Sequence, residues 1–149
     1  MKNKVLLNAT LIMCLVLINL SCIDNTGSGL KKRVKEYYKL EQRNDWDKTY
    51  SFRTPLFQDN IPKKMYKEGM KKFITGWTLQ KYEIKKVSYG SQNDFAEVEI
   101  NFSDRHESKG TSITTQMTTW ERIDGIWYGR DVGNRNHLPL NSELAFERY

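Results

Sequence analysis

Glu121 and Tyr128 are the two residues whose chemistry and spacing best suit proton transfer. They flank Asp124-Gly125, and a two-residue Asp-Gly connection between apolar runs is the strongest short-range signal of a β-hairpin. The hairpin sets Glu121 opposite Tyr128, where a buried carboxylate beside a phenol would have a raised pKa suited to acid–base catalysis. We favour the alternative, a solvent-facing Glu121 paired with Arg122 or Arg130, because glutamate is rarely fully buried. We therefore assign no catalytic residue and keep Glu121 and Tyr128 as candidates.

Asp104 and His106 form a second pair, two residues apart in the polar segment 103–110. On an extended chain both side chains point the same way, where they could act as an acid–base pair or as two metal ligands. A zinc site needs more than two protein ligands, so a solvated strand connection is the better interpretation. His137 has no partner in the sequence, and no motif for phosphate, zinc or serine-hydrolase chemistry occurs. We expect no metal and no cofactor.

The hairpin that carries Glu121 and Tyr128 spans residues 111–131, TSITTQMTTWERIDGIWYGRD. Its two-residue turn predicts a register in which Ile123 pairs with Ile126, Arg122 with Trp127, Glu121 with Tyr128, and Trp120 with Gly129. Because side chains alternate, one face carries Ile113, Met117, Ile123, Ile126 and Tyr128, and the other carries Trp120, Arg122 and Trp127. Both faces have apolar bulk, so the hairpin requires further strands and a covering layer.

Two further strands are expected before this hairpin. Residues 96–102 alternate between apolar and polar side chains, which is typical of a half-buried strand. Between Tyr82 and Tyr89 the apolar residues change face, with Ile84 on one side and Val87 on the other. This change predicts an irregularity near Lys85-Lys86. Together the runs predict a four-stranded antiparallel meander.

Three short helices are expected before the first strand. Residues 30–41 have an apolar stripe at helical spacing, with lysines largely on the other side. Asn44 or Asp45 can cap a second helix, which Thr54-Pro55 ends. Residues 62–74 form a third, with proline at its first position. Helices followed by a meander predict an α+β domain, in which three N-terminal helices pack on a curved four-stranded antiparallel sheet.

Residues 1–21 have the form of a secretory signal peptide. MKNK is followed by a mostly apolar run over residues 5–20 and then by Ser21-Cys22. A transmembrane anchor is the alternative, but it usually requires about 20 apolar residues, and this run is shorter. Cys14 would leave with the peptide, so the mature chain would keep one cysteine and could form no internal disulfide.

The run Ile18-Asn19-Leu20-Ser21-Cys22 resembles the bacterial lipoprotein box, in which a small residue precedes a cysteine that is lipidated and becomes the mature N-terminus. The resemblance implies lipidation at Cys22 and a lipidated tether over residues 22–29. A conventional cleavage site with a free or intermolecular thiol is the alternative. Ile23 follows the cysteine, which by the same resemblance implies an outer-membrane position facing the periplasm in a Gram-negative cell. In other bacteria the protein would lie in the cell membrane, so we expect a cell-envelope location in either case.

Three segments, VKEYYKLEQRNDWDKTYSF, YEIKKVSYGSQNDFAEVEINF and TTWERIDGIWYGRD, resemble parts of the nuclear-transport-factor-like superfamily, also called cystatin-like or SnoaL-like. The resemblance covers residues 30–131 and implies a cone-shaped domain, to which we assign residues 30–132, with a C-terminal tail over 133–149. Enzymes of this superfamily use Asp, His, Tyr or Glu in a pocket between sheet and helices. The fold also hosts many non-enzymatic modules, so it does not by itself imply a function.

We expect such a pocket to be a recognition site dominated by aromatic side chains, because these offer contact area without a proton acceptor near neutral pH. The residues assigned to it are Trp46, Tyr50, Trp120, Trp127 and Tyr128. The expected function is that of a non-catalytic domain that binds a protein partner or a small apolar ligand, with a homodimer through the sheet as one form of partner. The alternative is a tethered enzyme of the isomerase, dehydratase or cyclase type.

Two basic clusters lie at residues 31–39 and 63–72. Removal of Lys2 and Lys4 with the signal peptide lowers the formal net charge from +6 to about +4, which is too mild to imply a polyanionic partner. Nearby tyrosines lie on core stripes rather than beside the lysines, and export separates the chain from most nucleic acid, so no nucleic-acid partner is expected. A basic helix close to a lipid anchor could instead add attraction to anionic lipid headgroups.

Overall fold

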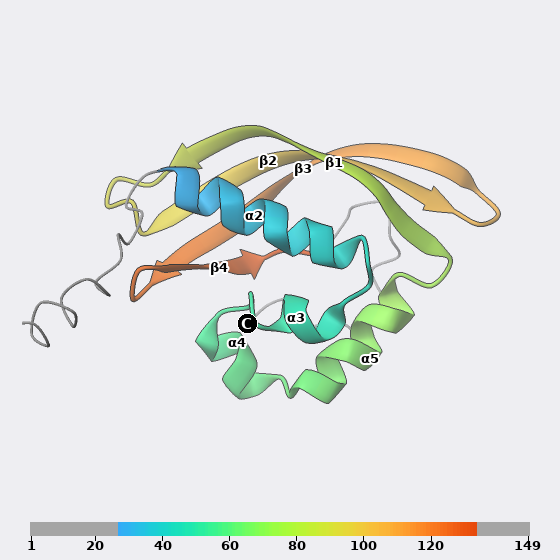
Figure 1. Ribbon diagram of the computed structural model, residues 1–149, viewed down its shortest axis with the longest axis horizontal. Helices are drawn as coiled ribbons and strands as arrows, with labels where there is room; N and C mark the ends of the chain where they lie inside the picture. Colours follow the sequence, from blue (N-terminus) through green and yellow to red (C-terminus); the bar gives the residue numbers. More distant parts are fainter. Residues whose placement is uncertain (1–26, 134–149) are drawn as a thin grey trace, which may run out of the picture.

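The computed structural model of the protein describes residues 27–133, which form helices followed by a four-stranded sheet (Figure 1). The helices are α2 (Gly27–Glu41), α3 (Trp46–Tyr50), α4 (Pro55–Asn60) and α5 (Lys63–Phe73). The strands are β1 (Trp77–Tyr89), β2 (Phe95–His106), β3 (Gly110–Ile123) and β4 (Ile126–Asp131), paired antiparallel in that order. The α+β class and the antiparallel meander are confirmed. The predicted signal peptide, Cys22, His137 and residues 134–149 lie outside the described residues.

The described residues hold four helices, so the expected number of three was wrong. The difference arises at Thr54-Pro55, which starts α4 as well as ending the preceding segment. Pro55 lies in the first turn, where a missing N–H is tolerated, and the Thr54 side chain accepts a hydrogen bond from the Phe57 N–H at 3.2 Å. The first described helix, α2, begins at Gly27, inside residues 22–29, which were expected to form the tether. None of the described helices is long and apolar enough to cross a membrane.

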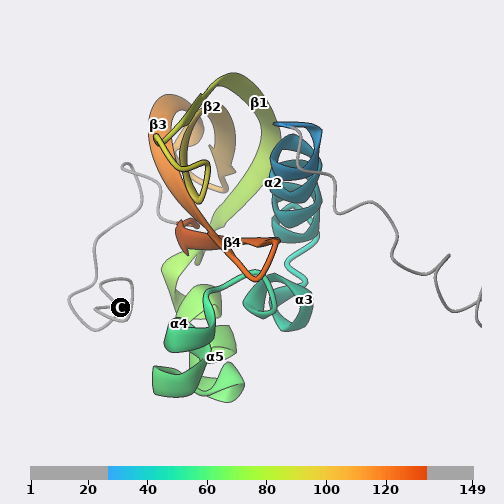
Figure 2. The same cartoon turned by 90° about the vertical axis from the view of Figure 1, so that its left-hand side faces the viewer.

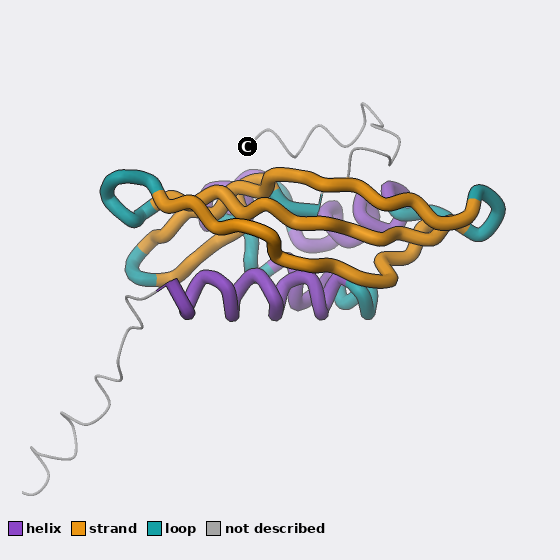
Figure 3. The backbone as a smooth tube through the Cα atoms, turned by 90° about the horizontal axis from the view of Figure 1, so that it is seen from above, coloured by secondary structure: helices purple, strands orange, loops and turns teal. Residues whose placement is uncertain are grey.

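All four helices lie on one side of the curved sheet. α2 runs along the β1 side, while α3, α4 and α5 gather below the sheet (Figures 1 and 2). From above, α2 follows one long edge of the sheet (Figure 3). Tyr82 Oη of β1 donates to Lys35 O of α2 at 2.9 Å, and Gln42 Nε2, just after the helix, donates to Gln80 O at 2.8 Å. α2 is therefore fixed to the edge of the sheet that β1 forms.

The β3–β4 hairpin has the predicted register. Trp120 lies opposite Gly129, Glu121 opposite Tyr128, and Ile123 opposite Ile126. Asp124 and Gly125 have φ values of 50° and 82°, as a two-residue turn of the primed type requires. The turn residues thus determine which side chains meet across the hairpin.

A bulge in β1 changes the expected orientation of Val87. The β1–β2 register shifts between Ile84 and Lys86, which confirms the irregularity near Lys85-Lys86. An extra residue in a strand reverses the alternation beyond it. Ile84 and Val87 therefore both pack against the core, and the expectation that they lie on opposite faces was wrong.

Replacement of Gly125 by valine should destabilise the fold. Its φ of 82° lies in the left-handed region, where a β-branched side chain is strained, so we expect Gly125→Val to lower the free energy of unfolding by more than about 1 kcal/mol. Urea denaturation followed by tryptophan fluorescence measures this loss. Gly90→Ala is the matched control, because Gly90 in the β1–β2 turn is not left-handed and an added Cβ would meet Phe95 only at ordinary contact distance, 3.5 Å. Equal losses in the two variants would contradict the turn assignment.

Candidate functional site

The space between α2 and the sheet is filled by aromatic rings. Tyr37 is the hub: its ring centroid lies 4.9 Å from that of Tyr38, 5.8 Å from that of Phe52 and 6.0 Å from that of Trp120. Tyr38 in turn lies 5.1 Å from Phe102 on β2. All five side chains are buried. The region in which the superfamily resemblance implies a pocket is therefore occupied by this core.

A second aromatic cluster joins α3, α4 and α5. Tyr50 lies 5.5 Å from Tyr66 and 6.4 Å from Phe57, between ring centroids. The phenol of Tyr50 donates to the carbonyl oxygen of Ile61 at 2.7 Å. The phenol of Tyr66 donates to Thr49 Oγ1 at 3.2 Å. The polar ends of these rings thus have partners within the helices themselves, which suits packing.

The structure does not bring the five predicted ligand-binding aromatics into one pocket. Trp120 and Trp127 belong to the cluster under α2, and Trp46 and Tyr50 belong to the helical cluster. Tyr128 follows Trp127 in β4 and points to the other face of the sheet. The many aromatic residues in the sequence indicated a large aromatic core, but they did not show that the rings would divide between the α2–sheet cluster and the helical cluster.

Arg53 is a buried residue that the sequence analysis missed. Its side chain is 2% exposed, and its guanidinium donates to Val132 O at 2.8 Å and to Arg130 O at 3.2 Å. The guanidinium carbon lies 4.1 Å from the centroid of the Phe57 ring. Backbone at Arg53 also forms a parallel bridge with Gly129 of β4. Arg53 therefore fastens the end of β4 to the segment between α3 and α4.

The charges of Arg53 and of a buried acid, Glu41, affect the pKa of two buried tyrosines, Tyr37 and Tyr66. Burial, reinforced by Tyr66 and Glu41, raises the pKa of Tyr37 well above its ordinary value, while Arg53 opposes the rise. Burial likewise raises the pKa of Tyr66, again against the effect of Arg53. Both phenols stay neutral at physiological pH, so they act here as packed, uncharged groups.

The pair Asp104 and His106 lies in β2, which continues to His106, so the expectation of a solvated loop over residues 103–110 was wrong. Asp104 is fully buried and lies across from Leu79 on β1. His106 closes the β2–β3 turn, where its Nδ1 accepts from the N–H groups of Ser108 and Lys109 at 3.1 and 3.2 Å. Its ring also packs on Trp77, 4.8 Å between centroids. Among residues 27–133 no three His, Cys, Asp or Glu side chains form a group that could hold a metal ion.

The outer face of the sheet, turned away from the helices, carries the side chains that were candidates for catalysis. Glu121 pairs with Tyr128 as predicted. Both side chains point outward, because they alternate with the buried Trp120 and Trp127 along their strands. The outer face also exposes three large apolar residues, with exposed fractions of 76% for Ile113, 45% for Met117 and 48% for Ile126. We call Ile113, Met117, Ile126 and Tyr128 the apolar stripe. It extends along the length of β3, because Ile123, the partner of Ile126, lies ten residues beyond Ile113.

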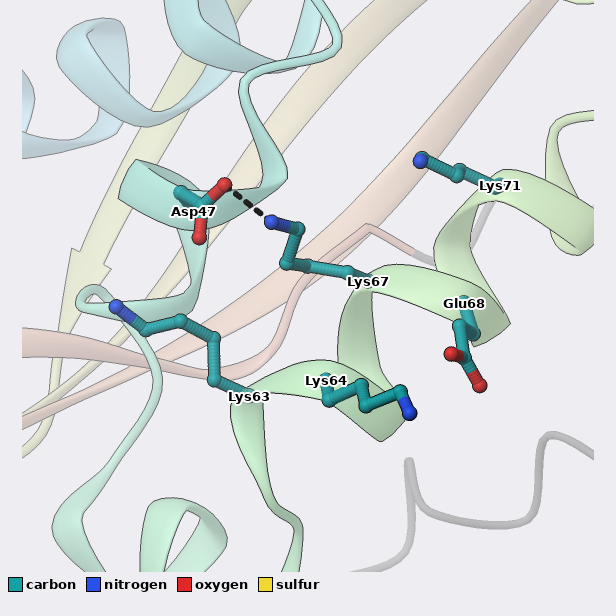
Figure 4. Close-up of a pocket in the computed structure, with 6 residues that line it drawn as sticks. All are labelled: Asp47, Lys63, Lys64, Lys67, Glu68 and Lys71. Carbon is teal, nitrogen blue, oxygen red and sulfur yellow. Dashed lines mark hydrogen bonds and ion pairs between the residues drawn. The ribbon is translucent and has the colours of Figure 1, made fainter.

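Two depressions on the helical side are basic. One, of about 380 Å³, lies on α5 and is lined by Asp47, Lys63, Lys64, Lys67, Glu68 and Lys71. Figure 4 shows that one of its lysines, Lys67, is paired with Asp47. The other, of about 640 Å³, lies between α2 and β1 and is lined by Lys31, Lys32, Lys35, Glu36, Lys39 and Tyr82.

Comparison with known proteins gives a likeness of fold. No family model and no curated protein matches the chain. Among solved structures, the solution structure of a SEC-C motif containing protein from Rhodopseudomonas palustris is similar, with a TM-score of 0.53 and 12% sequence identity, over 65% of this chain and 71% of that chain. At this identity the similarity concerns the arrangement of the elements alone.

Loss of the Arg53 side chain should weaken the whole domain. Arg53→Leu leaves the carbonyls of Arg130 and Val132 without their donor, so we expect a loss of about 3 kcal/mol in the free energy of unfolding. Chemical denaturation measures it, and Arg53→Lys should give an intermediate loss. The matched control is Arg105→Leu, at an exposed position of β2. If Arg53→Leu were no less stable than this control, Arg53 would not fasten β4.

Proposed function

We propose that the mature protein is a bacterial envelope lipoprotein, anchored through Cys22, whose domain is non-catalytic and binds a protein partner through the apolar stripe. The observation that carries the partner proposal is the exposure of Ile113, Met117 and Ile126 on the outer face of the sheet, whose inner face is covered by the core. The anchor proposal is supported by the apolar run and by Ser21-Cys22 that follows it.

A second copy of this chain is the partner that we propose. Apolar residues on an antiparallel face are ordinarily replaced by polar ones when that face meets water alone. Here Ile113 and Met117 alternate with inward-facing Thr114 and Gln116 on β3, which is the reverse of the usual distribution. Two copies related by a two-fold axis would lay one stripe on the other and remove both from water.

Membership of the nuclear-transport-factor-like superfamily, with its cone-shaped, cystatin-like fold, is part of the same proposal. It is supported by helices that precede an antiparallel meander and by the Asp124-Gly125 hairpin. Of the two ligands that the sequence left open, a small apolar molecule has less support than a protein, because the aromatic clusters occupy the interior. The enzyme alternative would need Glu121 to act from the outer face.

Replacement of Cys22 by alanine tests the anchor. The variant cannot accept a lipid, so we expect it to leave the membrane fraction or to accumulate unprocessed. Labelling with a radioactive fatty acid should mark the wild type and not Cys22→Ala. A wild-type protein that takes up no label and partitions into the aqueous phase would exclude lipidation.

Two lysines in the apolar stripe test the partner surface. Ile113→Lys with Met117→Lys should abolish self-association, because pairing would bury like charges, and should change thermal stability little since both positions are exposed. Sedimentation velocity of residues 22–149 carrying Cys22→Ser, over a range of concentrations, measures the association. A photo-crosslinking residue at position 117 should give a dimer-sized adduct in cells.

Leu56→Lys is the control for added charge, since Leu56 is an exposed apolar residue of α4, on the helical side of the sheet. Glu121→Gln is the control for chemistry: it keeps the size, removes the base and should preserve biological activity in a complementation assay. A wild type that stays monomeric and gives no adduct at position 117 would refute the second-copy proposal. Loss of activity in a folded, anchored Glu121→Gln variant would support the enzyme instead.

A further inference from the structure

The solvent side of α2 carries four lysines within a narrow arc. At about 100° per residue, Lys31, Lys32, Lys35 and Lys39 fall within roughly 100° around the helix axis. All four are exposed, and Glu36 is the acid that lines the same depression. The opposite side of α2 is fixed by Leu30, Val34, Tyr37 and Tyr38, each 0% exposed. The core therefore holds this lysine face in one orientation.

The lysines of this face are not neutralised by ion pairs within residues 27–133. Ion pairs within that range involve other lysines, among them Lys48 with Asp45, Lys67 with Asp47, and Lys85 with Glu83. The basic depression on α5 differs, because Lys67 is paired there with Asp47 (Figure 4) and a second acid, Glu68, lines it. The α2 face thus keeps a larger uncompensated positive charge than the α5 face.

The position of α2 in the chain brings this face close to the proposed anchor. Gly27 begins the helix five residues after Cys22, and five extended residues span at most about 17 Å. The 15 residues of α2 extend about 22 Å. Figure 1 shows the start of α2 toward one end of the molecule, and α5 below the sheet near the other end of α2. A lipidated Cys22 would therefore hold the first lysines of α2 close to the headgroups.

We propose that the lysine face of α2 docks on anionic phospholipid headgroups, so that the anchored domain lies with α2 against the membrane and the apolar stripe available to its partner. The depression between α2 and β1, about 640 Å³ in volume, can admit a phosphate group among the lysine ends. The orientation rests on the proposed lipoprotein anchor. The affinity of the face for anionic lipid belongs to the folded domain and can be measured without the anchor.

The test uses residues 22–149 with Cys22→Ser, which have no lipid and no cysteine. Co-sedimentation is measured with phosphatidylcholine vesicles and with vesicles in which about one third of the lipid is phosphatidylglycerol. We expect preferential binding to the anionic vesicles, weakened by high salt. The quadruple variant Lys31→Gln, Lys32→Gln, Lys35→Gln, Lys39→Gln should bind them at least tenfold more weakly.

The matched control is Lys63→Gln, Lys64→Gln, Lys71→Gln, Lys72→Gln, which makes the same change in net charge on α5 at four exposed positions. It should weaken vesicle binding less than threefold. Equal losses in the two variants would attribute binding to net charge and overturn the proposal, as would a wild type without preference for anionic vesicles. Binding of RNA without binding of vesicles would indicate a nucleic-acid surface and also overturn it. None of these outcomes depends on Cys22, so the anchor is judged separately by Cys22→Ala.

Discussion

The burial of two indoles, Trp120 and Trp127, determines which face of the β3–β4 hairpin points to the core and which points outward. They share one face of the last hairpin and are 0% and 7% exposed. Because neighbouring side chains in a strand alternate, placing the largest rings under α2 sends every adjacent residue outward. Glu121, Tyr128 and Met117 therefore meet solvent or a partner, whatever chemistry their types would permit in an interior. The packing of the core thus determines which surface is left for function.

The sequence predicted local pairing well and the choice of face poorly. Asp124-Gly125 has one favourable turn geometry, so the register of four residue pairs followed from it, and residues 96–102 alternate strictly enough to reveal their buried side. The hairpin sequence did not reveal which of its faces is buried, since Ile113 on one face and Trp120 on the other are both large and apolar. The outcome depends on rings from α2, such as Tyr37, that are distant in sequence. Arg53 was missed for the same reason, because its acceptors, the carbonyls of Arg130 and Val132, lie about 80 residues away.

The lysine face of α2 and the apolar stripe occupy different layers of the molecule, and this separation has a functional sense. α2 covers the inner side of the sheet, while Ile113 and Met117 lie on the outer side. A domain held to a membrane by its lysine face would keep the stripe accessible, whereas a single surface could not serve both contacts at once. The flexible, charged ends of lysine suit a fluid headgroup layer. The stiff, branched side chain of Ile113 suits a fixed protein surface.

The placement of β4 has a mechanical consequence. β4 is held on one edge by β3 and on the other by the segment at Phe52 and Arg53, where the Gly129 N–H donates to Phe52 O at 2.7 Å. The guanidinium of Arg53 adds two bonds at the end of the strand. A pull on the chain beyond Gly133 would load these bonds together with the β3 ladder. A force applied from the C-terminal side of residues 27–133 would therefore act on β4 before it reached the hairpin turn.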